Sequence, residues 1–302
     1  MRKLGKYFIE IAILLIILGL RDDIFNFVIK KYVESKEVSL EYRNNYYLSY
    51  NYLTVKDVDR FDIKNRNDLT NLYYSILNRG FDSFDFYCPE TYENCINDII
   101  DITNNQNFLS NVNGYVHPFN SFDTIETTYD SINRINLKII KAYTDVEIKQ
   151  INEKVEQIIA EQVKDETEPR KIIEIIHDYI VNNTKYDKDR ADNNIIRYNS
   201  NTAYGVLFEG YGICSGYADT MAIFLDYYKI PNFKVSSENH VWNAVYLDGE
   251  WYHLDLTWDD PITNTGVEML SHDYFLIDTD KILELDKTEH TINRDFYKEL
   301  IK

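Results

Sequence analysis

A cysteine, a histidine and an aspartate in the last third of the chain are the residues whose types could perform chemistry together. They are Cys214, His240 and Asp255. A thiolate nucleophile, a base that takes its proton and a carboxylate that orients the base form a recurring catalytic set. The sequence therefore predicts a thiol-dependent site, provided that the surrounding elements bring the three side chains together.

Cys214 is expected at the N-terminus of a helix. After it, apolar residues recur at helical spacing, and Pro231 ends the region: Tyr217, Met221, Phe224, Leu225 and Tyr228. The unpaired N–H groups and the dipole at a helix N-terminus stabilise a thiolate. The same N–H groups could bind an oxyanion that develops on a substrate.

His240 and Asp255 are expected on the two strands of a β-hairpin. The Asp-Gly pair at 248–249 lies between two aromatic-rich, β-prone runs, which predicts a two-residue turn. That turn sets a register in which His240 lies opposite Thr257 and Asp255 is its diagonal neighbour on the same face. Diagonal Cβ atoms lie within about 7–8 Å, close enough for the two side chains to meet. A three-residue loop would shift this register.

Two other interpretations involve the neighbouring His253. This residue is the main rival for the base, but residues two apart on a strand project in parallel, so it is less well placed to meet Asp255. Cys214, His240, His253 and Asp255 could in principle form a zinc site. The sequence has no C-x-x-C or H-E-x-x-H motif, which counts against a metal. We therefore expect neither a metal nor another cofactor.

These motifs resemble those of the transglutaminase-like cysteine enzymes in their bacterial form. The family pattern is roughly G-x-C-x-G-Y-A, then H-x-W-N, then W-Y-x-x-D-x-T-W, which matches residues 212–218, 240–243 and 251–258. An upstream helix at 171–187 and a closing strand at 274–278 extend the resemblance. It implies an α+β fold with a papain- or transglutaminase-like core, in which the Cys-bearing helix packs on an antiparallel β-sheet.

By this resemblance Cys214 is the nucleophile, His240 the general base and acid, and Asp255 the group that orients His240. The reaction would be attack on an amide carbonyl, release of an amine and formation of a thioester. Water would then hydrolyse the thioester, as in a peptidase or amidase, or an amine would intercept it, as in a cross-linking transglutaminase. A third possibility is a catalytically idle core that serves as a binding module.

Two aromatic residues are further candidates for the cleft. Tyr204 matches an aromatic position upstream of the cysteine in the family, where it could help to bind the oxyanion or simply pack in the core. Trp242 is close enough to His240 to line the cleft. Substrate specificity is expected in the loops 193–201 and 261–271.

The first 37 residues are expected to direct the chain to a membrane. Arg2, Lys3 and Lys6 precede an apolar run at 7–20 that contains one acidic residue, Glu10. The run is shorter than the about 20 residues of a typical spanning helix, and no A-x-A-like cleavage site follows it. We favour an uncleaved signal anchor with the catalytic part outside the cell. Secretion and a buried first helix of a soluble domain are the alternatives.

Cysteine usage and charge bear on the compartment and the partners. Cys88 and Cys95 are close in sequence and could form a disulfide in an oxidising environment, which leaves Cys214 as the reactive thiol. A helix from Thr91 onward could instead hold them apart. The net charge of −18 argues against a nucleic-acid partner. The expected partners are a protein or peptide substrate and the membrane.

A mostly helical accessory region at 38–163 is expected to precede a catalytic core at 164–302. Within it, residues 104–121 are polar and contain Gly114 and Pro118, which predicts a loop. Residues 131–143 alternate as in a strand, and Thr144-Asp145 caps a helix that runs through Ile159. The region could recruit substrate or act as a spacer.

Overall fold

The computed structural model describes residues 38–261 and 269–301, together with isolated positions between 19 and 28. The predicted anchor at 1–37 falls almost entirely outside the described residues, and so does most of the predicted specificity loop at 261–271. In the part of the chain that is described, no helix has both the length and the apolar character needed to span a membrane.

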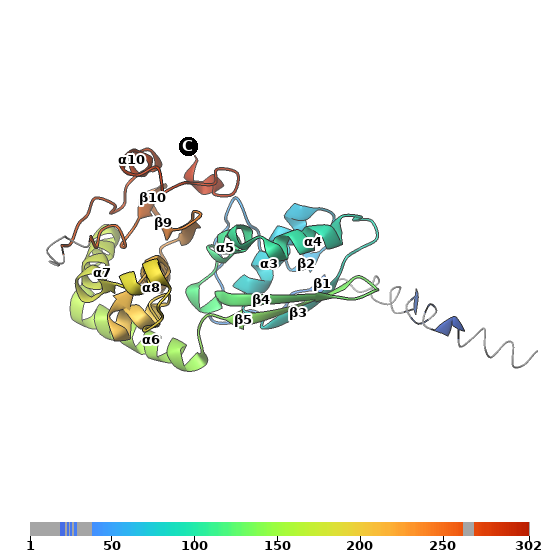
Figure 1. The fold of residues 1–302 in the computed structure, drawn as a ribbon. Helices are drawn as coiled ribbons and strands as arrows, with labels where there is room; N and C mark the ends of the chain where they lie inside the picture. The colour runs from blue at the N-terminus through green and yellow to red at the C-terminus, as the bar shows by residue number, and fades with distance from the viewer. Residues whose placement is uncertain are drawn as a thin grey trace, which may run out of the picture.

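The accessory region combines helices with an antiparallel three-stranded sheet (Figure 1). The strands, in their order across the sheet, are β3 (Ser83–Tyr87), β5 (Arg134–Lys141) and β4 (Phe122–Tyr129). The helices that lie over one face of the sheet are α3 (Arg66–Asn78), α4 (Cys95–Asn104) and α5 (Gln106–Asn113). Alternate β5 residues, Ile135, Leu137 and Ile139, are buried in the apolar cluster that these helices share. A short antiparallel pair, β1 (Val38–Ser39) and β2 (Arg60–Phe61), precedes them.

Local signals in this region predicted some elements and missed one. The strand expected at 131–143 is β5, and the helix capped by Thr144 is α6 (Asp145–Ile158), where Thr144 and Glu147 form a capping box. The loop expected at 104–121 is wrong in its first half, which forms α5. The Asn105 side chain caps this helix, and Leu109 and Val112 bury its inner face. Its many asparagines made that short apolar stripe hard to recognise in the sequence.

The disulfide considered from the sequence is present. Cys88 and Cys95 are bonded, with their Cα atoms 5.7 Å apart, and Cys214 is a free thiol. Cys95 is the first residue of α4, so the helix begins where the cross-link lies instead of separating the two sulfurs.

The core places the Cys-bearing helix on an antiparallel sheet, as predicted. Helix α9 (Cys214–Tyr227) packs against β8 (Asn232–Ser236) and β9 (Val241–Leu247), and β10 (Glu250–Leu254) completes the sheet. The predicted two-residue turn is confirmed, because Leu247 pairs with Glu250. Asp248 and Gly249 both have positive φ, 53° and 89°. Such a turn requires this conformation, and Gly adopts it without strain.

The remaining elements frame this core. They are a π-helical turn (Ile159–Val163), α7 (Pro169–Asn183), β6 (Lys185–Tyr186), α8 (Lys188–Asn193), a second π-helical turn (Gly205–Glu209), β7 (Tyr211–Gly212), α10 (Thr279–Leu285) and 3-10 turns at Pro118–Asn120 and Lys298–Leu300. Strands β6 and β7 are parallel and lead into α9. Together, these elements fix the entry of the chain into the helix that begins at Cys214.

The accessory region and the core share one apolar cluster. Tyr115, which follows α5, stacks on Phe233 of β8 with ring centroids 4.7 Å apart. Phe233 in turn stacks on Tyr297 near the C-terminus at 5.8 Å. A second cluster joins α6, α7 and α9. The boundary expected at residue 163 therefore lies between segments that pack together.

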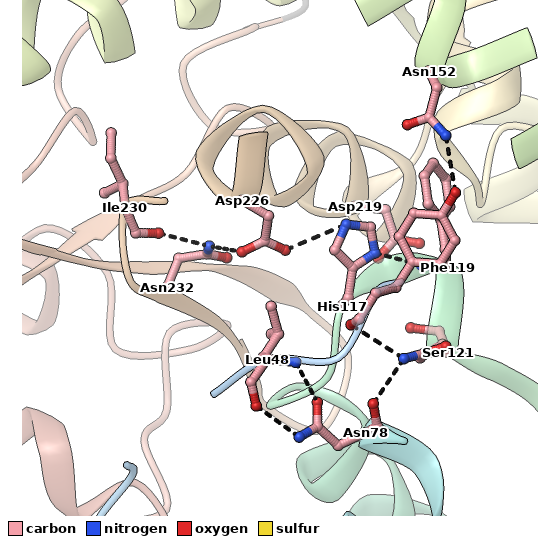
Figure 2. A network of polar contacts seen from close by, with 12 residues as sticks. Leu48, Asn78, His117, Phe119, Ser121, Asn152, Asp219, Asp226, Ile230 and Asn232 are labelled. Atoms are coloured by element: carbon pink, nitrogen blue, oxygen red, sulfur yellow. Dashed lines mark hydrogen bonds and ion pairs between the residues drawn. The ribbon is translucent and has the colours of Figure 1, made fainter. Parts of the chain in front are cut away.

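Polar contacts also connect the two regions at the C-terminal end of α9 (Figure 2). His117 Nε2 lies 3.7 Å from Asp226 Oδ2, and Asn232 Nδ2 donates to the other Asp226 oxygen at 2.8 Å. Burial lowers the pKa of His117 to about 3 and raises the pKa of Asp226 to about 7. The His117 ring is therefore neutral at physiological pH, and Asp226 is a buried carboxyl group that titrates near neutrality.

Candidate active site

Cys214 is the first residue of α9. The preceding Ile213 is extended and provides no side-chain cap. The N–H groups of the first helical turn have no acceptor within the helix. They therefore surround the thiol with donors and with the positive end of the helix dipole, in the position predicted from the sequence.

A loop at 199–202 holds this helix N-terminus in place. Ile213 N–H donates to Ser200 O at 2.8 Å, and Ser215 Oγ donates to Asn201 O at 3.0 Å. Gly216 allows this approach, because a Cβ at that position would lie 2.3 Å from Ser200 O. The position of Cys214 therefore depends on a backbone contact two residues further along the helix.

His240 and Asp255 meet at the open end of the hairpin. His240 directly precedes β9 and Asp255 directly follows β10, so neither lies within a strand as expected. The ladder ends at the pair Asn243–Leu254, before the predicted pairing of His240 with Thr257. Asp255 Oδ1 accepts hydrogen bonds from the N–H groups of Thr257 and Trp258, and these bonds turn the chain away from the hairpin. His240 Nε2 nevertheless lies 2.6 Å from Asp255 Oδ2.

The electrostatics of the pair favour an imidazolium beside a carboxylate. Burial lowers the pKa of His240, but the charge and hydrogen bond of Asp255, together with Cys214, outweigh it and raise that pKa to about 10. Burial raises the pKa of Asp255, but His240 and His290 outweigh it and hold the value well below its ordinary range. An imidazolium next to a thiol stabilises the thiolate.

Cys214 and His240 line the same cavity, which has a volume of about 330 Å³. Most of the residues that line it have polar side chains, and they come from both regions, with Asn107, Ser110 and Asn113 of α5 facing the core segment 234–241. Lys234 is buried in this wall and paired with Asp219. The other Asp219 oxygen accepts from Tyr143 Oη at 2.7 Å. The accessory region therefore forms part of the wall beside the thiol.

His253, the rival base, is engaged elsewhere. Its Nδ1 accepts from Trp242 Nε1 at 2.9 Å, and its Nε2 lies 3.1 Å from Thr279 Oγ1. Burial lowers the pKa of His253 to about 3. The four-residue zinc set considered from the sequence is not assembled around it, because both of its ring nitrogens have other partners.

The two aromatic candidates have different positions. Trp242 stacks on His240 with ring centroids 5.7 Å apart, so it supports the imidazole from behind and does not line the cavity. Tyr204 stacks on Phe208 at 4.8 Å and is also not among the residues that line the cavity. The packing interpretation of Tyr204 therefore holds, because its ring belongs to the apolar cluster behind α9.

The sequence interpretation missed His290 and Asp286. His290 Nε2 lies 2.8 Å from Asp255 Oδ2, and His290 Nδ1 lies 3.0 Å from Asp286 Oδ2. Neither residue belongs to the three motifs at 212–218, 240–243 and 251–258. The only local signal is the spacing of Asp286 and His290, four residues apart, while the contact with Asp255 joins segments that are distant in sequence.

A second histidine cluster stabilises the turn that follows Asp255. His177 bridges two carboxylates, with Nδ1 at 2.9 Å from Asp178 and Nε2 at 3.2 Å from Asp259. His272 also approaches Asp178, at 2.8 Å, so His177, Asp178 and His272 place three possible metal ligands within 4.8 Å of one another. Hydrogen bonds already account for these contacts. Asp259 N–H donates to Asp255 O, which connects this cluster to the site.

Comparisons with known proteins match the segment that carries this site. Residues 156–256 match the sequence model of the transglutaminase-like superfamily. A solved transglutaminase ("TGase") is 16% identical, with a TM-score of 0.32 over 45% of this chain and 44% of that chain. A "putative protease" from Parabacteroides distasonis is 12% identical, with a TM-score of 0.25 over 48% of this chain and 40% of that chain. The chain thus spans less than half the length of either structure. A search among curated proteins finds no match.

Residues 156–256 therefore belong to a transglutaminase-like core, as the three motifs predicted. The matched segment contains Cys214, His240 and Asp255. Members of this superfamily are generally enzymes built on a cysteine-type acyl-transfer fold.

Proposed function

We propose that the protein is a cysteine-dependent acyl-transfer enzyme that hydrolyses peptide or isopeptide amides through a thioester. Cys214 is the nucleophile, His240 the general base and acid, and Asp255 the residue that orients His240. The observation that carries the proposal is the 2.6 Å contact between His240 Nε2 and Asp255 Oδ2, beside a cavity that Cys214 and His240 both line.

In the proposed mechanism each ring nitrogen of His240 has a separate task. His240 Nε2 is held by Asp255, so Nδ1 is the nitrogen that exchanges a proton with the thiol. The thiolate forms a bond to the amide carbon, and the carbonyl oxygen becomes an oxyanion near the N–H groups of the first turn of α9. The C–N bond then breaks, and His240 gives its proton to the departing amine. Water, deprotonated by His240, attacks the thioester and releases the acid and the thiol.

The cavity at Cys214 supports hydrolysis over the two alternatives. Serine and asparagine side chains line it beside Cys214, so water has access to the thioester. A transglutaminase would need a bound amine to compete with that water. An idle binding module would need no open cavity at the thiol and no buried, charged His–Asp pair.

Two further features support a site of action outside the cell. The Cys88–Cys95 disulfide is typical of an oxidising compartment. The basic and apolar N-terminal sequence is suited to a signal anchor. We propose that the enzyme is attached to the cell surface, and that α5 helps to select its protein or peptide substrate because it forms one wall of the cavity.

The first test is the pH dependence of iodoacetamide labelling at Cys214, read by peptide mass spectrometry. In the wild type we expect rapid labelling at mildly acidic pH, because the His240 imidazolium and the helix N-terminus favour the thiolate, and in His240→Ala we expect labelling at that pH to slow. His272→Ala, which removes a half-exposed imidazole that does not line the cavity, is the control and should behave as wild type. Equal labelling rates at mildly acidic pH in all three proteins would contradict the proposal.

A second assay separates the alternatives. Release of a free amine from model peptides supports hydrolysis, whereas incorporation of a labelled amine into a glutamine-bearing acceptor supports the transglutaminase. Cys214→Ala should abolish either activity without unfolding the protein, since the thiolate itself bonds to the substrate. Full turnover in that variant would refute a thiol mechanism.

A further inference from the structure

We propose that His290 and Asp286 are positioning residues that hold Asp255, and through it His240, in the reactive geometry. The proposal rests on the proposed function, because it assigns these two residues to the same thiol site. The structure places them behind the triad in an unbroken line of side-chain contacts from His240 through Asp255 and His290 to Asp286.

The Asp255 carboxylate is held on all sides. Its Oδ2 contacts His240 Nε2 at 2.6 Å and His290 Nε2 at 2.8 Å. Its Oδ1 accepts from the N–H groups of Thr257 and Trp258 at 2.9 and 3.2 Å. Without His290, Asp255 Oδ2 would keep His240 as its remaining side-chain partner. The carboxylate plane could then rotate about its anchored oxygen.

The His290 ring is itself fixed, as a positioning residue must be. It is fully buried and stacks on Tyr274, with ring centroids 5.2 Å apart and an interplanar angle of 19°. Trp242 and Trp258 approach it edge-on, at 4.9 and 5.3 Å. Because Trp242 also stacks on His240, the same indole contacts both imidazoles. Aromatic packing therefore sets the angle between the base and its support.

Asp286 completes the arrangement from the far side. Its Oδ2 accepts from the N–H groups of Glu289 and His290 and contacts His290 Nδ1 at 3.0 Å. Burial raises the pKa of Asp286, but its side-chain and backbone hydrogen bonds outweigh that effect and hold the pKa well below its ordinary range. Asp286 therefore stays ionised and directs the His290 ring, as outer carboxylates direct the histidines of metal sites.

Neither residue lines the cavity, so their action is separable from substrate binding. His290→Leu should lower kcat by roughly 10- to 100-fold, the usual cost of losing an outer-shell partner, with little change in KM. His290→Gln, whose amide can still donate a hydrogen bond toward Asp255, should recover part of the loss. Asp286→Asn should give an intermediate effect, since it weakens only the outer contact.

The decisive readout is the pH profile of Cys214 labelling by iodoacetamide. His290→Leu should shift the profile toward that of Asp255→Asn. The matched control is His117→Leu, which also removes a buried imidazole with two polar partners, Phe119 N–H and Asp226, neither of which belongs to the line from His240 to Asp286. It should lose stability in urea unfolding without this shift. If His290→Leu does not fold, Asp286→Asn carries the same test, because this substitution barely changes the size of the side chain and keeps it polar.

The outcomes separate the two proposals. If Asp255→Asn shifts the profile and both support variants retain the wild-type profile and kcat, the positioning role is refuted while the triad stands. If the wild type itself shows an ordinary thiol profile and no turnover, the proposed function fails, and the positioning role fails with it.

Discussion

Replacement of Gly216 by alanine sets two opposing effects against each other at the helix that carries the nucleophile. Alanine is favoured over glycine within a helix by about 1 kcal/mol, so the substitution would stabilise an unconstrained helix. Here the new Cβ would lie 2.3 Å from Ser200 O and 3.2 Å from Thr202 O. Ordinary contacts of this kind begin at 3.4 Å, so the two backbones must separate by about 1 Å.

The loop cannot yield freely, because Ser200 is tied on two sides. Its carbonyl oxygen accepts from Ile213 N–H, and its hydroxyl donates to Asp187 at 2.7 Å. Overpacking of this kind costs about 1–3 kcal/mol, which exceeds the gain in helix propensity. We therefore expect a net loss of stability of up to about 2 kcal/mol. A displacement of about 1 Å near Cys214 should lower kcat/KM by on the order of 100-fold.

The assay combines urea unfolding with turnover of a peptide amide. Gly249→Ala in the hairpin turn is the matched control, because its Cβ meets nothing within 4 Å while its φ of 89° strains any other residue. That variant should lose stability and retain kcat/KM once folded. A Gly216→Ala enzyme with full activity and raised stability would refute the close packing described for Ser200 and α9.

Three further predictions test other parts of the structure. Asp255→Asn should lower kcat by orders of magnitude through a misoriented imidazole, and an unchanged rate would assign that role to another residue. Asp226 has a folded pKa raised from 3.8 to about 7, so its contribution to stability is lost as pH rises through that range. Asp226→Asn should therefore raise Tm relative to wild type by an amount that grows from pH 5 to pH 8, equivalent to at most about 4 kcal/mol, and a constant difference would contradict the burial argument. Paired replacement of Cys88 and Cys95 by serine should cost about 2–3 kcal/mol in urea unfolding, and an intact mass that reductant does not change would exclude the disulfide.

The features that the sequence predicted are those fixed by short-range rules. The register of the hairpin follows from a two-residue turn, because Asp248 and Gly249 tolerate the backbone angles it needs. That register was enough to bring Asp255 to His240. The start of α9 at Cys214 follows from helical periodicity and from flanking glycines that permit close approach.

The features that it missed depend on contacts between distant segments. His290 reaches Asp255 across 35 positions, and no spacing rule connects them. The sequence predicts a loop in place of helix α5, because the polar residues of this helix outnumber its two buried apolar residues, Leu109 and Val112. Its Asn107 and Ser110 reach the cavity only because Tyr115 packs on Phe233 of the core sheet. That packing is a property of the folded molecule.

The shared apolar cluster has a practical meaning for protein engineering. A fragment that begins at residue 156, where the family match begins, would lack Tyr115 and its neighbours. The aromatic surface of the sheet at Phe233 would then be exposed to water. Such surfaces promote aggregation. The fragment would also lack one wall of the cavity at Cys214. A unit suited to expression, transplantation or directed evolution should therefore include the accessory region with its disulfide as well as the core.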